Sequence, residues 1–150
     1  MSENEFEQRL IHAWTKQYIA GTAGGADAAE ISLVIKGCHA AHYDLLGMDG
    51  ILEPFAGRIE DFINFLQSQW NWIVRYDRET NVILADENKA DCVCPLFQTG
   101  IVSIGKLCAC SEGFAERMFA FVLLRPVRAE VVRSVIRDGQ SCIYRITVDG

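Results

Sequence analysis

Basic residues are in the minority in this sequence. Its 150 residues include 14 Lys and Arg against 20 Asp and Glu, which gives a net charge of −6 at pH 7. A surface that binds nucleic acid needs clustered positive charge to neutralise phosphates. The composition therefore argues against a nucleic-acid partner.

Membrane and export signals are also missing. No stretch reaches the roughly 18 consecutive apolar residues that are typical of a membrane-spanning helix. The sequence begins Met-Ser-Glu-Asn-Glu-Phe-Glu, which has neither the basic nor the apolar region of a secretory leader. We therefore expect a cytoplasmic protein without a membrane partner, whose six cysteines are reduced.

Repeats and low-complexity segments are absent too, and half of the residues are hydrophobic. This composition is typical of a globular chain, and 150 residues are enough to bury a core of their own. We therefore expect a single domain over residues 1–150.

Hydrophobic periodicity predicts an α+β fold. A spacing of about four between apolar residues indicates amphipathic helices, and alternation indicates strands paired in two β-hairpins. N-terminal helices are expected to pack on one face of this mostly antiparallel sheet. The predicted helices cover residues 3–20, 27–45, 54–66 and 112–123, and the predicted strands cover 71–76, 81–85, 127–137 and 142–148.

Two Cys-x-Cys pairs, Cys92/Cys94 and Cys108/Cys110, lie close together in the sequence. In an extended segment residues i and i+2 point to the same side, so each pair can present two sulfurs in one direction. Thiolates are preferred ligands of zinc and of iron–sulfur clusters. The loop between the pairs is short, and we expect all four sulfurs to form one metal site, with Cys38 as a fifth group. Packed inert thiols, or a redox or nucleophilic thiol, are the alternatives.

Other polar groups near this segment are candidates for chemistry. Cys110 lies just before a predicted helix, whose N-terminus favours a thiolate, so it is a candidate nucleophile. Glu112 and Glu116 share a face of that helix and are candidate bases or ligands, or they complement the helix dipole. His39 and His42 also share a helix face, either as ligands or as a polar rim.

The second half of the chain resembles a known family. Three segments are similar to the L-2-amino-thiazoline-4-carboxylic acid hydrolase-like family. They are Cys-Val-Cys-Pro-Leu, Leu-Cys-Ala-Cys-Ser-Glu-Gly-Phe and Arg-Pro-Val-Arg-Ala-Glu-Val-Val-Arg-Ser-Val-Ile-Arg-Asp-Gly-Gln-Ser-Cys-Ile-Tyr-Arg-Ile. The layout also resembles 4-vinyl reductase-type ligand-binding domains, which share a fold with trafficking-particle subunits. The similarity in sequence covers residues 90–148. The first half of the chain is similar only in the order of its predicted helices and strands. Members often have Phe-Gly before Pro-Val, where this chain has Leu123-Leu124-Arg125.

The resemblance implies a pocket between helices and sheet. From it and from the cysteines we expect a domain that binds a small molecule, a metal, or both. The alternative is a hydrolase that acts on a non-peptide C–N bond of a small cyclic substrate. A homodimer is expected because helices on one face would leave the other face of the sheet uncovered.

Overall fold

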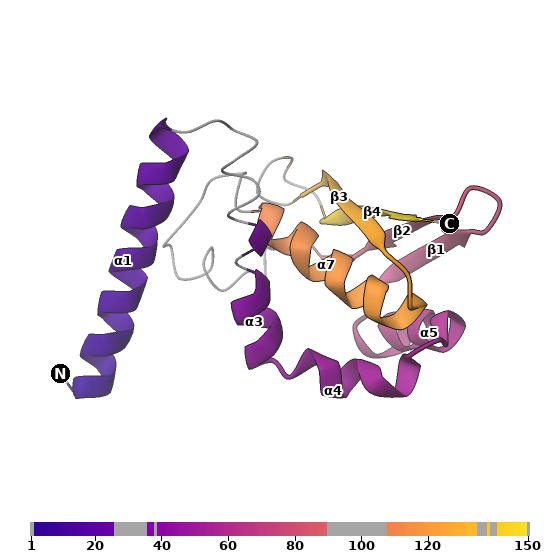
Figure 1. Cartoon of the computed structure of the whole chain (residues 1–150), viewed down its shortest axis with the longest axis horizontal. Helices are drawn as coiled ribbons and strands as arrows, with labels where there is room; N and C mark the ends of the chain where they lie inside the picture. Colours follow the sequence, from indigo (N-terminus) through magenta and orange to yellow (C-terminus); the bar gives the residue numbers. More distant parts are fainter. Residues whose placement is uncertain are drawn as a thin grey trace.

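The computed structural model describes residues 2–25, 36–37, 39–89, 108–134, 138 and 141–149; for residue 14, residues 16–25 and residues 108–110 it describes the backbone alone. Four antiparallel strands form one sheet in the order β1-β2-β4-β3 (Figure 1). Two hairpins, β1-β2 and β3-β4, are joined through the β2-β4 pairing. The strands are β1 (Ile73–Asp77), β2 (Val82–Asp86), β3 (Val127–Arg133) and β4 (Ile143–Val148).

Helices occupy one side of this sheet. Helix α5 contacts β1, and helix α7 contacts β3 and β4. Three shorter helices of the described residues lie between α1 and α5 in the sequence. The helices are α1 (Glu3–Gly25), α3 (His39–Leu45), α4 (Met48–Leu52), the 3-10 helix η1 (Glu53–Phe55), α5 (Ile59–Gln69) and α7 (Cys108–Leu123). The α+β class and the antiparallel sheet of two hairpins are thus confirmed.

The core lies between α5, α7 and the inner face of the sheet. Strand register aligns Val74, Ala85, Tyr144 and Val131 across all four strands, and all four are buried. The alternation that the sequence shows in β1, β2 and β4 therefore marks the buried face correctly. The fully buried helical side chains that meet this face are Phe62, Leu66, Met118, Phe119 and Val122.

The connection around Pro54 differs from the prediction. The third helix was expected to begin at Pro54, but Pro54 lies in η1 and α5 begins at Ile59. Gly57 separates the two, with a φ of 73° and an N–H that donates to the carbonyl of Val122 at 2.8 Å. This left-handed glycine ends one helical segment and ties it to α7, which a periodicity argument does not detect.

Leu124 follows α7 in the left-handed conformation, with a φ of 56°. This is the helix-ending position where glycine is usual, because a Cβ there costs about 1–2 kcal/mol. The chain therefore turns before Pro126 with a leucine in the left-handed conformation and without a glycine. Leu124 is 70% exposed, so its side chain does not contribute to the core.

Helix α1 stands apart from the sheet and the other labelled helices (Figure 1). The helices that contact the sheet are α5 and α7. Across the part of the chain that the structure describes, no helix is both long and apolar enough to cross a membrane.

Candidate functional site

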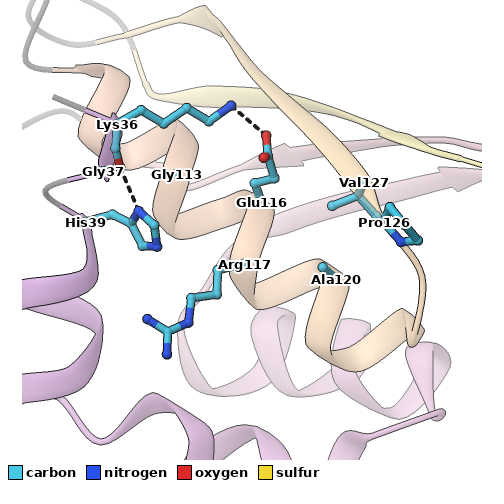
Figure 2. A pocket seen from close by; sticks show the side chains of 9 residues that line it. All are labelled: Lys36, Gly37, His39, Gly113, Glu116, Arg117, Ala120, Pro126 and Val127. Carbon is cyan, nitrogen blue, oxygen red and sulfur yellow. Dashed lines mark hydrogen bonds and ion pairs between the residues drawn. The ribbon is translucent and has the colours of Figure 1, made fainter. Parts of the chain in front are cut away.

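A groove runs along α7, between the segment that leads into α3 and the start of β3. We call it the α7 groove, and its volume is about 490 Å³. Figure 2 shows the residues that line it, which come from two stretches far apart in sequence, 36–39 and 113–127. They are Lys36, Gly37, His39, Gly113, Glu116, Arg117, Ala120, Pro126 and Val127.

The sequence of α7 explains why it can carry such a groove. Its buried side packs into the core through Ala115, Met118, Phe119 and Val122. Its groove side carries Gly113, Glu116, Arg117 and Ala120, at the helical spacing of three and four. One face of the helix therefore anchors the groove to the sheet while the other presents polar groups.

Gly113 allows the closest approach between α7 and the residues before α3. A Cβ built at this position would lie 2.4 Å from the carbonyl oxygen of Lys36 and 2.6 Å from Nδ1 of His39. No real Cβ makes contacts that short, so only glycine fits here without a shift of the backbone. The floor of the groove depends on this residue.

His39 has a fixed orientation above Gly113. Its Nδ1 lies 2.6 Å from the carbonyl oxygen of Lys36. Because a carbonyl oxygen can only accept, Nδ1 carries the hydrogen and donates it. In the neutral ring, Nε2 then keeps its lone pair and is the nitrogen available to a ligand or a proton.

Lys36, Glu116 and strand β3 form a linked set of polar contacts. The Lys36 ammonium group lies 2.7 Å from Oε2 of Glu116 (Figure 2). The same oxygen accepts the backbone N–H of Ala129 at 3.1 Å. One turn earlier in α7, Oε1 of Glu112 accepts the backbone N–H of Val131 at 2.9 Å. The two carboxylates that the sequence offers as catalytic bases thus bind the outer edge of β3.

Arg117 closes the groove on the side of α3. Its guanidinium lies 4.0 Å from the centroid of the Tyr43 ring and 3.2 Å from Oδ1 of Asp44. Burial raises the pKa of Tyr43 to about 12, with the Asp49 and Asp44 carboxylates adding to the shift and Arg117 opposing it. Tyr43 is therefore neutral at physiological pH and acts as a platform for the cation.

A second polar cluster lies around Tyr144, near the start of β4. The Tyr144 hydroxyl donates to Oε1 of Glu87 at 2.7 Å, and Glu87 also forms an ion pair with Lys89. Burial, together with the Glu87 carboxylate, holds the pKa of Tyr144 well above its usual range. These groups satisfy one another and link the ends of β2 and β4. Beside them Cys142 is buried, as the sequence predicts for a core cysteine.

The predicted thiolate site falls largely outside the described residues. Cys38, Cys92 and Cys94 are not among them, and Cys108 and Cys110 are described only by their backbone. Both of these latter positions lie in the first turn of α7, which begins at Cys108 and not after Ser111. Positions i and i+2 of a helix are roughly 200° apart, so the extended geometry expected of this pair is wrong. The described side chains contain no metal-binding group of three or more His, Cys, Asp or Glu.

The residues that the structure brings together in the α7 groove differ from the site residues that the sequence predicts. Of the two candidate glutamates on α7, Glu116 lines the groove and Glu112 does not, and the candidate His39 lines it as well. Sequence reasoning offered His39 as a ligand or as part of a polar rim, and it did not single out Lys36, Arg117 or Gly113. Gly113 is the second residue of the helix predicted over 112–123, and a glycine inside a helical pattern, which often has a packing reason, was the one available signal for it.

Comparisons with known proteins support the fold but do not indicate a function. No protein-family model and no curated protein matches the sequence. One solved structure, trafficking protein particle complex subunit 3 from Naegleria fowleri covalently bound to palmitic acid, superposes with a TM-score of 0.53. The alignment covers 95% of this chain and 97% of that one, at 10% sequence identity. At that identity the likeness shows a shared fold and does not transfer a function.

Proposed function

We propose that this chain is a binding domain for a small organic molecule that carries a carboxylate, and that the molecule lies in the α7 groove. The observation that carries the proposal is the Lys36 ammonium group, which already holds a carboxylate oxygen of Glu116 inside the groove. An ammonium group has three donors, and Glu116 is its one partner among the described residues. It can therefore bind a second carboxylate without giving up the first.

The rest of the lining supports the same ligand class. Ala120, Pro126 and Val127 give the groove an apolar wall, and Arg117 adds a second cation. Ligand sites commonly combine apolar walls with a few placed polar groups. The trafficking-particle subunit of similar fold is covalently bound to palmitic acid, so this fold is compatible with an acyl ligand, although that ligand belongs to the other protein.

Replacing Lys36 by methionine is expected to weaken carboxylate binding about tenfold, the equivalent of about 1.4 kcal/mol. The probe is 2-aminothiazoline-4-carboxylate, chosen from the family that the sequence resembles, and binding is measured by calorimetry. The neutral carboxamide of the same ring should bind the unchanged protein about as weakly as the acid binds the variant.

Arg78→Met is the matched control, because Arg78 forms an exposed ion pair with Glu60 and does not line the groove. It should bind the probe as the unchanged protein does. Equal affinity for acid and carboxamide, or full affinity in Lys36→Met, would contradict the proposal.

A hydrolase is the second candidate, and the orientation of His39 favours it. With Nδ1 donating to a carbonyl, Nε2 can take a proton from water as the water oxygen bonds to the carbon of a C–N bond. The proton then passes to the nitrogen as that bond breaks. Cys110 as a nucleophile, and Glu112 or Glu116 as the base, stay predictions beside this arrangement.

His39→Gln distinguishes catalysis from binding. Glutamine keeps a polar side chain but has no group that takes up a proton near neutral pH. If the chain hydrolyses the probe, this variant should retain probe affinity and lose turnover, measured by mass spectrometry of the products. Turnover that survives in His39→Gln would exclude His39 as the base.

The thiolate site for zinc or an iron–sulfur cluster stays a proposal of its own. The residues that would hold it are Cys38, Cys92, Cys94, Cys108 and Cys110, and the described residues neither assemble nor separate them. A cytoplasmic location likewise stays a prediction.

A further inference from the structure

Helix α1 carries an apolar stripe that nothing in the described part of the chain covers. Phe6, Leu10 and Ile11 are 58%, 56% and 61% exposed. The stripe continues in the sequence at Trp14 and Tyr18, four residues apart each time. Large apolar side chains gathered on one helix face mark an interaction surface more often than isolated ones do.

The start of α1 is set by local chemistry. The Ser2 hydroxyl accepts the N–H of Glu5 at 3.2 Å, and the Glu5 carboxylate accepts the N–H of Ser2 at 3.1 Å. This reciprocal pair caps the helix but cannot hold its full length, because isolated helices gain most of their stability from packing of an apolar face. A stable α1 needs a partner for the stripe.

We propose that the partner is α1 of a second copy, packed antiparallel to the first. The stripe is symmetric in sequence about His12: an antiparallel pair centred there places Phe6 opposite Tyr18 and Leu10 opposite Trp14. Each of these four large residues then meets another large apolar or aromatic residue of the partner copy. Ridges at a spacing of four residues are those that interdigitate in helix packing.

Charge favours the antiparallel direction. Glu3 and Glu7 lie on the same face as the stripe, by their helical spacing from Phe6, Leu10 and Trp14. A parallel pair would place these carboxylates against their own copies. The antiparallel pair places Glu7 opposite Gln17 and Glu3 opposite Gly21, which are uncharged.

A membrane surface is a poorer occupant of the stripe. Helices that lie on anionic lipid are rich in Lys and Arg on their polar face. Residues 2–25 contain three glutamates against Arg9 and Lys16, so this helix offers no positive excess. The proposed pairing is independent of the α7 groove and of any ligand.

Sedimentation equilibrium of the full chain at tens of micromolar tests the pairing. The unchanged protein should sediment at twice the 16.8 kDa mass of one chain. Leu10→Glu and, separately, Phe6→Glu should each sediment as a single chain. Gln8→Glu adds the same charge off the stripe and should remain a dimer.

The opposite outcomes would overturn the proposal. A single chain in the unchanged protein, or a dimer that persists in both stripe variants, contradicts pairing through α1. A lower melting temperature in Leu10→Glu with no change of mass would show that the stripe packs on its own chain. Orientation is tested with Glu7→Gln: a dissociation constant within about twofold of the unchanged protein fits the antiparallel pair, and a much tighter dimer indicates parallel helices.

Discussion

Replacing Gly113 by alanine is expected to destabilise the protein by about 2 kcal/mol, within the range typical of overpacked cores. In an ordinary helix the same change is stabilising by about 1 kcal/mol, since alanine is the better helix former. Here the new methyl group would lie 2.4 Å from a backbone carbonyl oxygen, which cannot rotate away as a flexible side chain can. The clash therefore outweighs the gain in helix propensity.

Chemical denaturation measures this effect directly, and the melting temperature should fall by roughly 4–8 °C for a chain of this size. Gly50→Ala is the matched control. Gly50 also lies in a helix, has an ordinary φ, and a Cβ there meets no atom within 4 Å. Its replacement should leave stability unchanged or raise it slightly, whereas an equal effect of the two substitutions would show that the contact at Gly113 is not tight.

Gly113→Ala should also disturb the groove. Relief of the clash requires the segment at Lys36 and His39 to move away from α7, which separates Lys36 from Glu116. Loss of probe affinity larger than that of Lys36→Met would follow, because the variant displaces two lining residues at once.

The contrast between Gly113 and the strands shows where sequence reasoning succeeds. Alternation of buried and exposed residues in β1, β2 and β4 is a local property that repeats along each strand. The two hairpins could therefore be predicted from the sequence. The contact of Gly113 with residues 36 and 39 joins segments more than 70 residues apart, and no local pattern records it. The left-handed Leu124 could not be expected either, since its residue type argues against that conformation.

The difference between local patterns and long-range contacts also explains why the predicted site residues differ from those that line the groove. Cys-x-Cys spacing predicts a geometry only if the segment is extended, and the helix that was predicted to begin at residue 112 already begins at Cys108. Lys36 and Arg117 become neighbours of one groove because α7 packs beside α3, and two isolated basic residues give no sign of that in the sequence. Electrostatic partners across such distances are set by the packing of the core.

Removal of both α7 glutamates is the second change with a large expected effect. In Glu112→Ala/Glu116→Ala, the backbone N–H groups of Ala129 and Val131 lose their acceptors at the outer edge of β3. An unsatisfied, partly buried N–H costs about 1–3 kcal/mol, so for the two groups we expect the double variant to lose about 2–6 kcal/mol of unfolding free energy. An uncapped edge strand also promotes association between chains, and the variant should aggregate at lower concentration.

The glutamine variants separate this structural role from a catalytic one. Glutamine keeps the oxygen that accepts the N–H but cannot take up a proton near neutral pH, so Glu112→Gln/Glu116→Gln should retain most of the stability. Glu130→Ala is the control on β3: Glu130 is exposed, and its contact with Arg145 at 3.7 Å contributes little. If the glutamine variant is stable and still hydrolyses the probe, the carboxylates serve to protect the strand edge. Stability retained with turnover lost would instead assign one of them the proton transfer, and equal stability of the alanine variant and the unchanged protein would show that the β3 edge does not need them.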